Sequence, residues 1–185
     1  MPITQKTTIK TEAYFSKDGK HRYLLKKEWD KRKKKAMVIM INPSSADSMV
    51  IDHTTMYVIN NLSKLDFGSV DIVNMFSKID IRLSSRQSIE ELVDKENDNY
   101  IEKSAAKADY IIIAWGSIGE NNKKIKERQK EIFNLLKKYK DKLYTICDLK
   151  GRGGYHPLAP QVRHSWKLEK MNLEDDLKIK RKGKK

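Results

Sequence analysis

Four short runs of this sequence carry polar or aromatic residues directly after apolar runs of strand length. They are Asn42-Pro43-Ser44 with Asp47, Asn74 with Phe76, Trp115-Gly116, and His156-Pro157. In an open α/β sheet, ligands bind outside the C-terminal ends of the strands. The sequence therefore predicts one composite site built from four loops.

Asn42, Asp47 and His156 are the candidate catalytic residues. An asparagine side chain both donates and accepts hydrogen bonds, and a carboxylate that faces a cleft can position a water as general base. A histidine on a loop over the strand ends can act as acid, as base, or as a donor to a developing anion. The ordinary alternatives are a strand-ending turn, a solvated loop acid and an incidental histidine.

A second set of residues is predicted to contact substrate. Asn74 can read an amide-like edge such as that of a pyrimidine base, and Phe76 can supply a stacking wall or pack in the core. Gly116 permits close approach of the backbone, although Gly116-x-x-Gly119 is neither a dinucleotide fingerprint nor a P-loop. The complete set is Pro43, Ser44, Asn74, Phe76, Trp115 and Gly116.

Composition excludes several classes of site. The single cysteine, Cys147, lies in an apolar run and reads as a small buried hydrophobe, so neither a disulfide nor a cysteine-built zinc site is expected. The scattered histidines do not have metal-ligand spacing, and we expect no metal and no cofactor. No apolar stretch reaches the roughly 18 residues of a membrane span. A cytoplasmic protein is expected.

The net charge of +14 is unevenly distributed. Residues 1–35 hold 12 Lys/Arg against 4 Asp/Glu, and residues 167–185 hold 8 against 4, whereas the 131 residues between them hold 19 against 17. Clustered cations are typical of proteins that contact a phosphate backbone, although lysine-rich ends also serve solubility. The residues predicted to contact nucleic acid are Arg152, Lys180, Arg181 and Lys182.

The apolar pattern predicts an α/β domain with three layers. Runs over 36–41, 70–73, 110–114 and 143–147 predict four parallel strands, and helical spacing places helices after the first three. Residues 14–25 predict a β-hairpin around Asp18-Gly19. We therefore expect a basic arm with hairpin over 1–35, a core over 36–166 and a basic tail over 167–185.

Six motifs in their order resemble an uncharacterised bacterial and phage family, domain of unknown function 1643. They are Arg22-Tyr23-Leu24-Leu25, Asn42 to Asp47, Asp52-His53-Thr54, Asn74, Ala114-Trp115-Gly116 and His156-Pro157. The chain more distantly resembles the uracil-DNA glycosylase superfamily, which implies a four-stranded parallel α/β/α fold. By that likeness Asn42 positions water, Asn74 reads the base and His156 stabilises the leaving base. Asp47 is the candidate replacement for an acid that the Asn42-Pro43-Ser44 run lacks.

The resemblance implies a protein that recognises a nucleobase in DNA or in a nucleotide and hydrolyses an N-glycosidic bond. The alternative is a non-catalytic module that binds a nucleotide or a nucleic acid, in phage–host conflict or DNA modification. A third possibility is a protein-interaction domain on the same fold. Whether the chain is an enzyme is therefore left open by the sequence, as are the preferred base and the oligomeric state.

Overall fold

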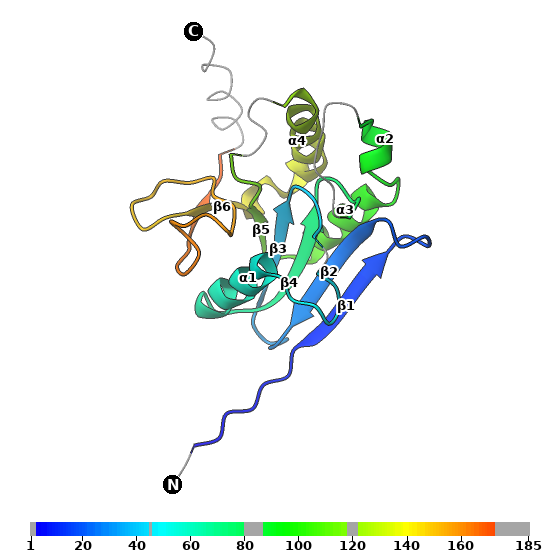
Figure 1. Ribbon diagram of the computed structural model, residues 1–185. Coiled ribbons are helices and arrows are strands. Elements are labelled where there is room, and N and C mark those ends of the chain that lie inside the picture. Colours follow the sequence, from blue (N-terminus) through cyan, green and yellow to red (C-terminus); the bar gives the residue numbers. More distant parts are fainter. Residues whose placement is uncertain (1–2, 45, 80–86, 118–121, 173–185) are drawn as a thin grey trace.

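The computed structural model describes residues 3–44, 46–79, 87–117 and 122–172. Its seven strands form one sheet in the order β1-β2-β4-β3-β5-β6-β7 (Figure 1). The strands are β1 Lys10–Phe15, β2 Arg22–Glu28, β3 Lys34–Met40, β4 Phe67–Asn74, β5 Tyr110–Ile113, β6 Leu143–Cys147 and β7 Lys167–Lys170. The helices are α1 His53–Lys64, α2 Ile89–Leu92, α3 Asn97–Lys107 and α4 Lys123–Leu136, and the 3₁₀ helix η1 spans Lys137–Lys142.

The α/β class is confirmed, and the four expected strands pair in parallel, but they lie within a seven-stranded sheet and do not form a sheet of their own. The sheet is mixed: β4, β3, β5 and β6 pair in parallel, whereas β1 with β2, β2 with β4, and β6 with β7 pair antiparallel. The hairpin expected over 14–25 is present as β1 and β2, whereas the sequence pattern did not indicate β7, which is only four residues long and carries two exposed lysines. The hairpin is thus continuous with the sheet, since Leu25 of β2 lies opposite Ile72 of β4.

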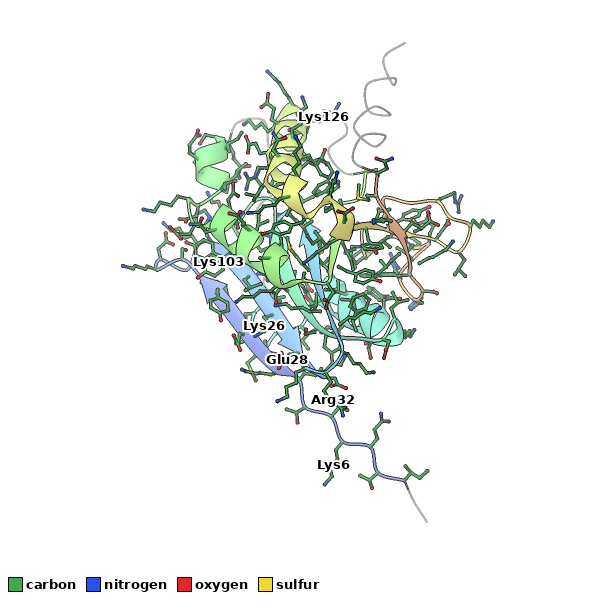
Figure 2. All side chains as sticks on the ribbon, turned by 180° about the vertical axis from the view of Figure 1, so that it is seen from behind. Lys6, Lys26, Glu28, Arg32, Lys103 and Lys126 are labelled. Carbon is green, nitrogen blue, oxygen red and sulfur yellow. The ribbon has the colours of Figure 1, made fainter. Side chains whose placement is uncertain are left out.

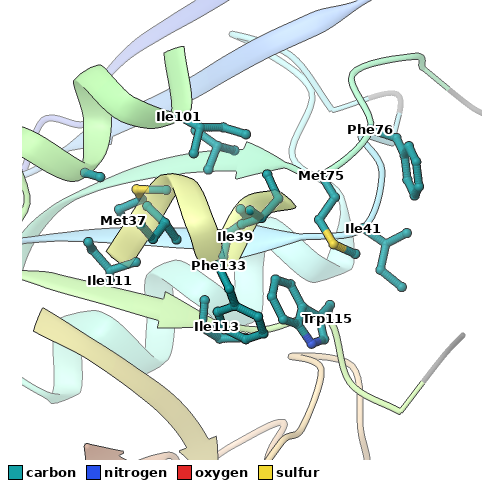
Figure 3. Close-up of a cluster of buried hydrophobic side chains, with 14 of the residues drawn as sticks. Met37, Ile39, Ile41, Met75, Phe76, Ile101, Ile111, Ile113, Trp115 and Phe133 are labelled. Atoms are coloured by element: carbon teal, nitrogen blue, oxygen red, sulfur yellow. The ribbon is translucent and has the colours of Figure 1, made fainter. Parts of the chain in front are cut away.

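Helices cover both faces of the sheet. On one face, Val58 and Leu62 of α1 pack with Val38 and Ile72 of the strands, together with Trp166 from the segment that follows β6. On the other face, α3 and α4 cover the alternate strand residues; Figure 3 shows this second cluster around Met37, Ile39, Ile101, Ile111, Trp115 and Phe133. The strands therefore bury both faces, which explains their continuous apolar runs.

The helix boundaries follow the local capping signals. Asp52 is the N-cap of α1 and its side chain accepts from the Thr55 N–H at 2.7 Å, while Asn122 caps α4 in the same way. The helical segment after β4 is divided in two, because α2 ends at Leu92 and α3 begins at Asn97.

Gly68 lies near the start of β4. The turn before it contains Asp66, whose φ is +63°. A Cβ at position 68 would lie 1.8 Å from the backbone oxygen of Asp30. A side chain is excluded at this position, because the backbone after β2 lies directly against Gly68.

Candidate functional site

A small polar pocket lies at the C-terminal ends of the parallel strands. Its volume is about 50 Å³, and it is lined by Arg22, Met40, Asn42, Ser44, Asp52, Thr54, Thr55 and His156. The connection after β3 leads to α1 on one face, and that after β5 leads to α4 on the other. The pocket therefore lies where an open α/β sheet places its ligands. A space of this size accommodates one or two water molecules.

Asp52 places an ionised carboxylate in this pocket. Burial alone would raise the pKa of Asp52. Hydrogen bonds from Ser44 and Thr55 and the charge of Arg22 together outweigh burial, so the pKa lies below its ordinary value. The Ser44 hydroxyl donates to one carboxylate oxygen and the Thr55 N–H to the other. The two ends of the loop between β3 and α1 therefore both lie at the pocket, and the Ser44–Asp52 hydrogen bond connects them.

His156 presents a neutral imidazole on the other side of the pocket. Burial lowers the pKa of His156, while the charge of Asp52 opposes this, and the net pKa lies below the ordinary histidine value. The Leu158 N–H donates to Nδ1 at 3.2 Å. Because Nδ1 accepts, the proton of the neutral ring is on Nε2, which is left as a donor.

The loop that carries His156 is fixed to the strands. The Tyr155 N–H donates to the Ile146 carbonyl of β6 at 3.2 Å, and the Ala159 N–H to the His156 carbonyl at 2.9 Å. A Cβ at Gly116, whose φ is +69°, would lie 3.0 Å from the Cβ of His156. Trp115-Gly116 thus supports the histidine from the adjacent strand.

Arg22 stands between the pocket and Asn74. Its side chain is 2% exposed. The guanidinium donates to the carbonyls of Ala46 and Ser44, and at 3.4 Å to Oδ1 of Asn74. Asn74 itself is 1% exposed and is not among the residues that line the pocket. Within the described chain, its Nδ2 has no hydrogen-bond partner.

Two helices fix the backbone at the end of β4. Asn97 of α3 donates from Nδ2 to the Asn74 carbonyl at 3.0 Å and to the Met75 carbonyl at 3.3 Å. Arg128 of α4 donates from Nε to the same Met75 carbonyl at 2.9 Å, and Asp98 and Glu131 neutralise its charge. These contacts determine where Asn74 points.

Several residues predicted for the site lie elsewhere. Asp47 is outside the pocket, where its carboxylate accepts from the Met49 and Val50 N–H groups of a tight turn. Those hydrogen bonds lower the pKa of Asp47. Phe76 is fully buried in the core, and Trp115 packs edge-on against Phe133 with ring centroids 5.2 Å apart. Of the other predicted contacts, Ser44 lines the pocket and Pro43 lies buried beside it.

The predicted nucleic-acid contacts are only partly described. Arg152 forms an ion pair with Asp148 at 2.7 Å. Gly119 and the segment with Lys180, Arg181 and Lys182 lie outside the described residues. No group of three or more His, Cys, Asp or Glu side chains that could hold a metal occurs in the described part of the chain.

Sequence reasoning assigned no chemistry to four residues that line the pocket, namely Arg22, Asp52, Thr54 and Thr55. Asp52 and Thr54 read as helix caps, which Asp52 is, and Arg22 read as a hairpin residue. The available signal was the resemblance, in which Arg22 and Asp52-His53-Thr54 occur as motifs without a role. Their convergence depends on β2 pairing antiparallel with β4, which brings the first residue of β2 to the end of β4.

The fold and site together define a mixed α/β domain with a polar pocket at its parallel strand ends. A family described as protein of unknown function (DUF1643) matches residues 22–158, and the chain belongs to this family. No curated protein and no solved structure matches the chain. No helix within the described ranges has the length and apolar character required to span a membrane.

Proposed function

We propose that this protein recognises a nucleobase in nucleic acid or in a nucleotide and hydrolyses its N-glycosidic bond. The observation that supports this most is the pairing, in one pocket, of an ionised Asp52 with a neutral His156 that keeps Nε2–H as a donor. Such a reaction requires a negative group beside the sugar cation and a hydrogen-bond donor beside the departing base.

The roles follow from the chemistry of bond cleavage. When the bond between the sugar C1′ and the base nitrogen breaks, its electron pair leaves with the base and the sugar becomes cationic. The Asp52 carboxylate would stabilise that cation and accept a proton from the water that adds to C1′. His156 Nε2–H would donate to the departing base, whose negative charge needs a donor. Asn42 would hold the water.

The proposal assigns the acid to Asp52 rather than to Asp47. The Asp47 carboxylate accepts hydrogen bonds from the Met49 and Val50 N–H groups outside the pocket, whereas Asp52 lines the pocket. The distant likeness to uracil-DNA glycosylases supports the roles of Asn42 and His156. In our proposal Arg22 contacts the base. Asn74 positions the Arg22 guanidinium, because the Asn74 side-chain oxygen accepts a hydrogen bond from it. A base must displace the pocket's water and neighbouring side chains, since about 50 Å³ is below the roughly 300 Å³ of typical ligand sites.

Base release from DNA tests the proposal. Duplexes that carry uracil, hypoxanthine or alkylated bases, and free nucleotides, are incubated with the protein and assayed for abasic sites or free base. Asp52→Asn and His156→Ala should each lower the rate by about 10²-fold or more. Asp47→Asn and His164→Ala are matched controls outside the pocket and should retain it. Failure to release any base from any of these substrates would overturn the proposal.

The second candidate is a module that binds a nucleotide or nucleic acid without turnover. The small size of the pocket favours it, because the hydrogen bonds of Arg22 and Asp52 hold the lining side chains in place. Titration calorimetry distinguishes the two candidates. Binding that depends on Arg22 and Asp52, with the ligand recovered intact, identifies the module.

A further inference from the structure

The outer face of α4 presents a row of exposed lysines. Lys126 and Lys130 lie in α4, and Lys137 is its C-cap and the first residue of η1, still with helical backbone angles. The three are spaced by four and seven residues, so they lie on one side of the helix. All three are exposed, and no carboxylate in the described part of the chain forms an ion pair with any of them. Figure 2 shows Lys126 at the outer side of α4. We call these three residues the α4 lysine row.

The row belongs to a segment whose charge differs from that of the domain around it. Residues 123–142 hold nine Lys/Arg and three Asp/Glu, a net charge of +6. The rest of the segment 36–166 holds ten Lys/Arg and fourteen Asp/Glu, a net charge of −4. The net charge of the central domain is therefore nearly zero because the basic segment 123–142 offsets the acidic remainder of residues 36–166.

The N-terminal arm, by contrast, has much of its basic charge neutralised. Six of its twelve Lys/Arg form ion pairs with carboxylates, and two further cations, Arg22 and Lys27, are buried in the domain. The paired residues are Lys10, Lys20, Lys26, Arg32, Lys33 and Lys35. The high charge of residues 1–35 is thus a poor guide to where a polyanion would bind.

The character of the α4 face distinguishes between partners. No large hydrophobic side chain of α4 is exposed, because Ile125, Ile132, Phe133 and Leu136 all face the core. A protein partner would require apolar or aromatic anchors at the centre of its interface, and a membrane surface would require an apolar face to insert. A phosphate backbone requires only well-placed cations.

From these observations we infer that the α4 lysine row binds the phosphate backbone of nucleic acid. From Lys126 to Lys137 there are eleven helical steps, or about 16 Å, a length over which a DNA duplex carries about ten negative charges. Arg128, anchored in the same helix to the Met75 carbonyl, keeps α4 fixed to the end of β4. Because α4 begins after Trp115-Gly116, one end of the row lies at the edge of the sheet that holds the pocket. The inference rests on the proposed function only in that it takes the recognised base to lie in nucleic acid rather than in a free nucleotide.

The test measures binding without chemistry. A fluorescein-labelled duplex of normal bases is titrated with the wild-type protein, and the dissociation constant is measured from 50 to 300 mM NaCl. The variant K126Q/K130Q/K137Q should bind at least about tenfold more weakly at low salt. The slope of log K against log salt should become shallower by about 2 to 3, since each phosphate contact contributes about 0.9. The control K17Q/K31Q/K95Q removes the same charge from exposed lysines elsewhere and should bind as the wild type does.

Each other outcome overturns the inference. Equal losses in the two triple variants would mean that only the net charge matters, and an unchanged affinity of K126Q/K130Q/K137Q would place the backbone elsewhere. Absence of duplex binding by the wild type would also overturn it, but would leave hydrolysis of a free nucleotide possible. Conversely, a protein that binds through the row but releases no base would lack the proposed activity while retaining this surface.

Discussion

Gly116 and His156 are in direct contact, although forty residues separate them along the chain. A Cβ at position 116 would approach the Cβ of His156 to 3.0 Å and its backbone nitrogen to 3.3 Å. The turn after β5 therefore determines how far the imidazole can extend into the pocket. A glycine here serves both a positive φ and the placement of the histidine.

Gly116→Ala should displace His156 and thereby impair the site. An alanine at positive φ costs about 1–2 kcal/mol, so the melting temperature should fall by several degrees. Gly154→Ala is the matched control, because Gly154 also has a positive φ, of +82°, with nothing within 4 Å of the added Cβ. The two variants should lose similar stability, measured by thermal unfolding, but only Gly116→Ala should lose ligand binding or base release. Equal function in both would show that the contact is unimportant.

Substitutions of Asp52 should separate its charge from its role as helix cap. Asparagine caps helices as well as aspartate does, so Asp52→Asn should change the free energy of unfolding by less than about 0.5 kcal/mol, whereas Asp52→Ala should cost about 1 kcal/mol. Both variants should abolish the activity proposed above, because both remove the carboxylate. Chemical denaturation and the base-release assay provide the two readouts. An active Asp52→Asn would refute the role of the charge.

His156 should titrate below the ordinary histidine pKa of 6.5, because burial disfavours the imidazolium. Since the folded state binds this proton less readily than the unfolded chain does, the stability from His156 is complete above about pH 6.5 and is lost as pH falls through the folded pKa. An NMR titration of the ring measures the pKa directly. Asp52→Asn should lower it further, because the Asp52 charge raises it. A pKa above 6.5 in the wild type would contradict the neutral imidazole.

Asn97→Ala should loosen the end of β4. The substitution leaves the buried carbonyls of Asn74 and Met75 without the Asn97 donor, which costs about 1–3 kcal/mol. Asn99→Ala is the control from the same helix, because Asn99 is exposed and its side chain donates to the exposed Glu96 side chain. Thermal unfolding compares their stability, and ligand affinity reports whether Arg22 and Asn74 keep their positions. Equal stability of the two variants would contradict the bracing role.

Much of the fold could be predicted from local patterns. The apolar runs that begin at Ala36 and Leu143 form β3 and β6, and the Asp52 and Asn122 caps start α1 and α4. These features depend on residues close together in the sequence. β7 could not be predicted, because Lys167-Leu168-Glu169-Lys170 forms a strand only through pairing with the edge of β6.

The candidate site was predicted less completely than the fold. Asn42, Ser44 and His156 line the pocket, as their places after strands indicated. Asp47 and Asp52 could not be ranked from sequence, since both are acids in the same loop and only the turn geometry directs one of them away. The place of Arg22 depends on the antiparallel pairing of β2 with β4, which local patterns do not reveal.

The two edge strands have a consequence for defining the domain by its family boundaries. The family match begins at Arg22 and ends at Leu158, whereas β1 and β7, which flank the sheet, lie outside it. A polypeptide trimmed to the matched residues would leave one edge of β2 and one edge of β6 unpaired and would remove Val162 and Trp166 from the core. Bare strand edges promote self-association. The segment that matches the family is therefore shorter than the segment that forms the complete sheet.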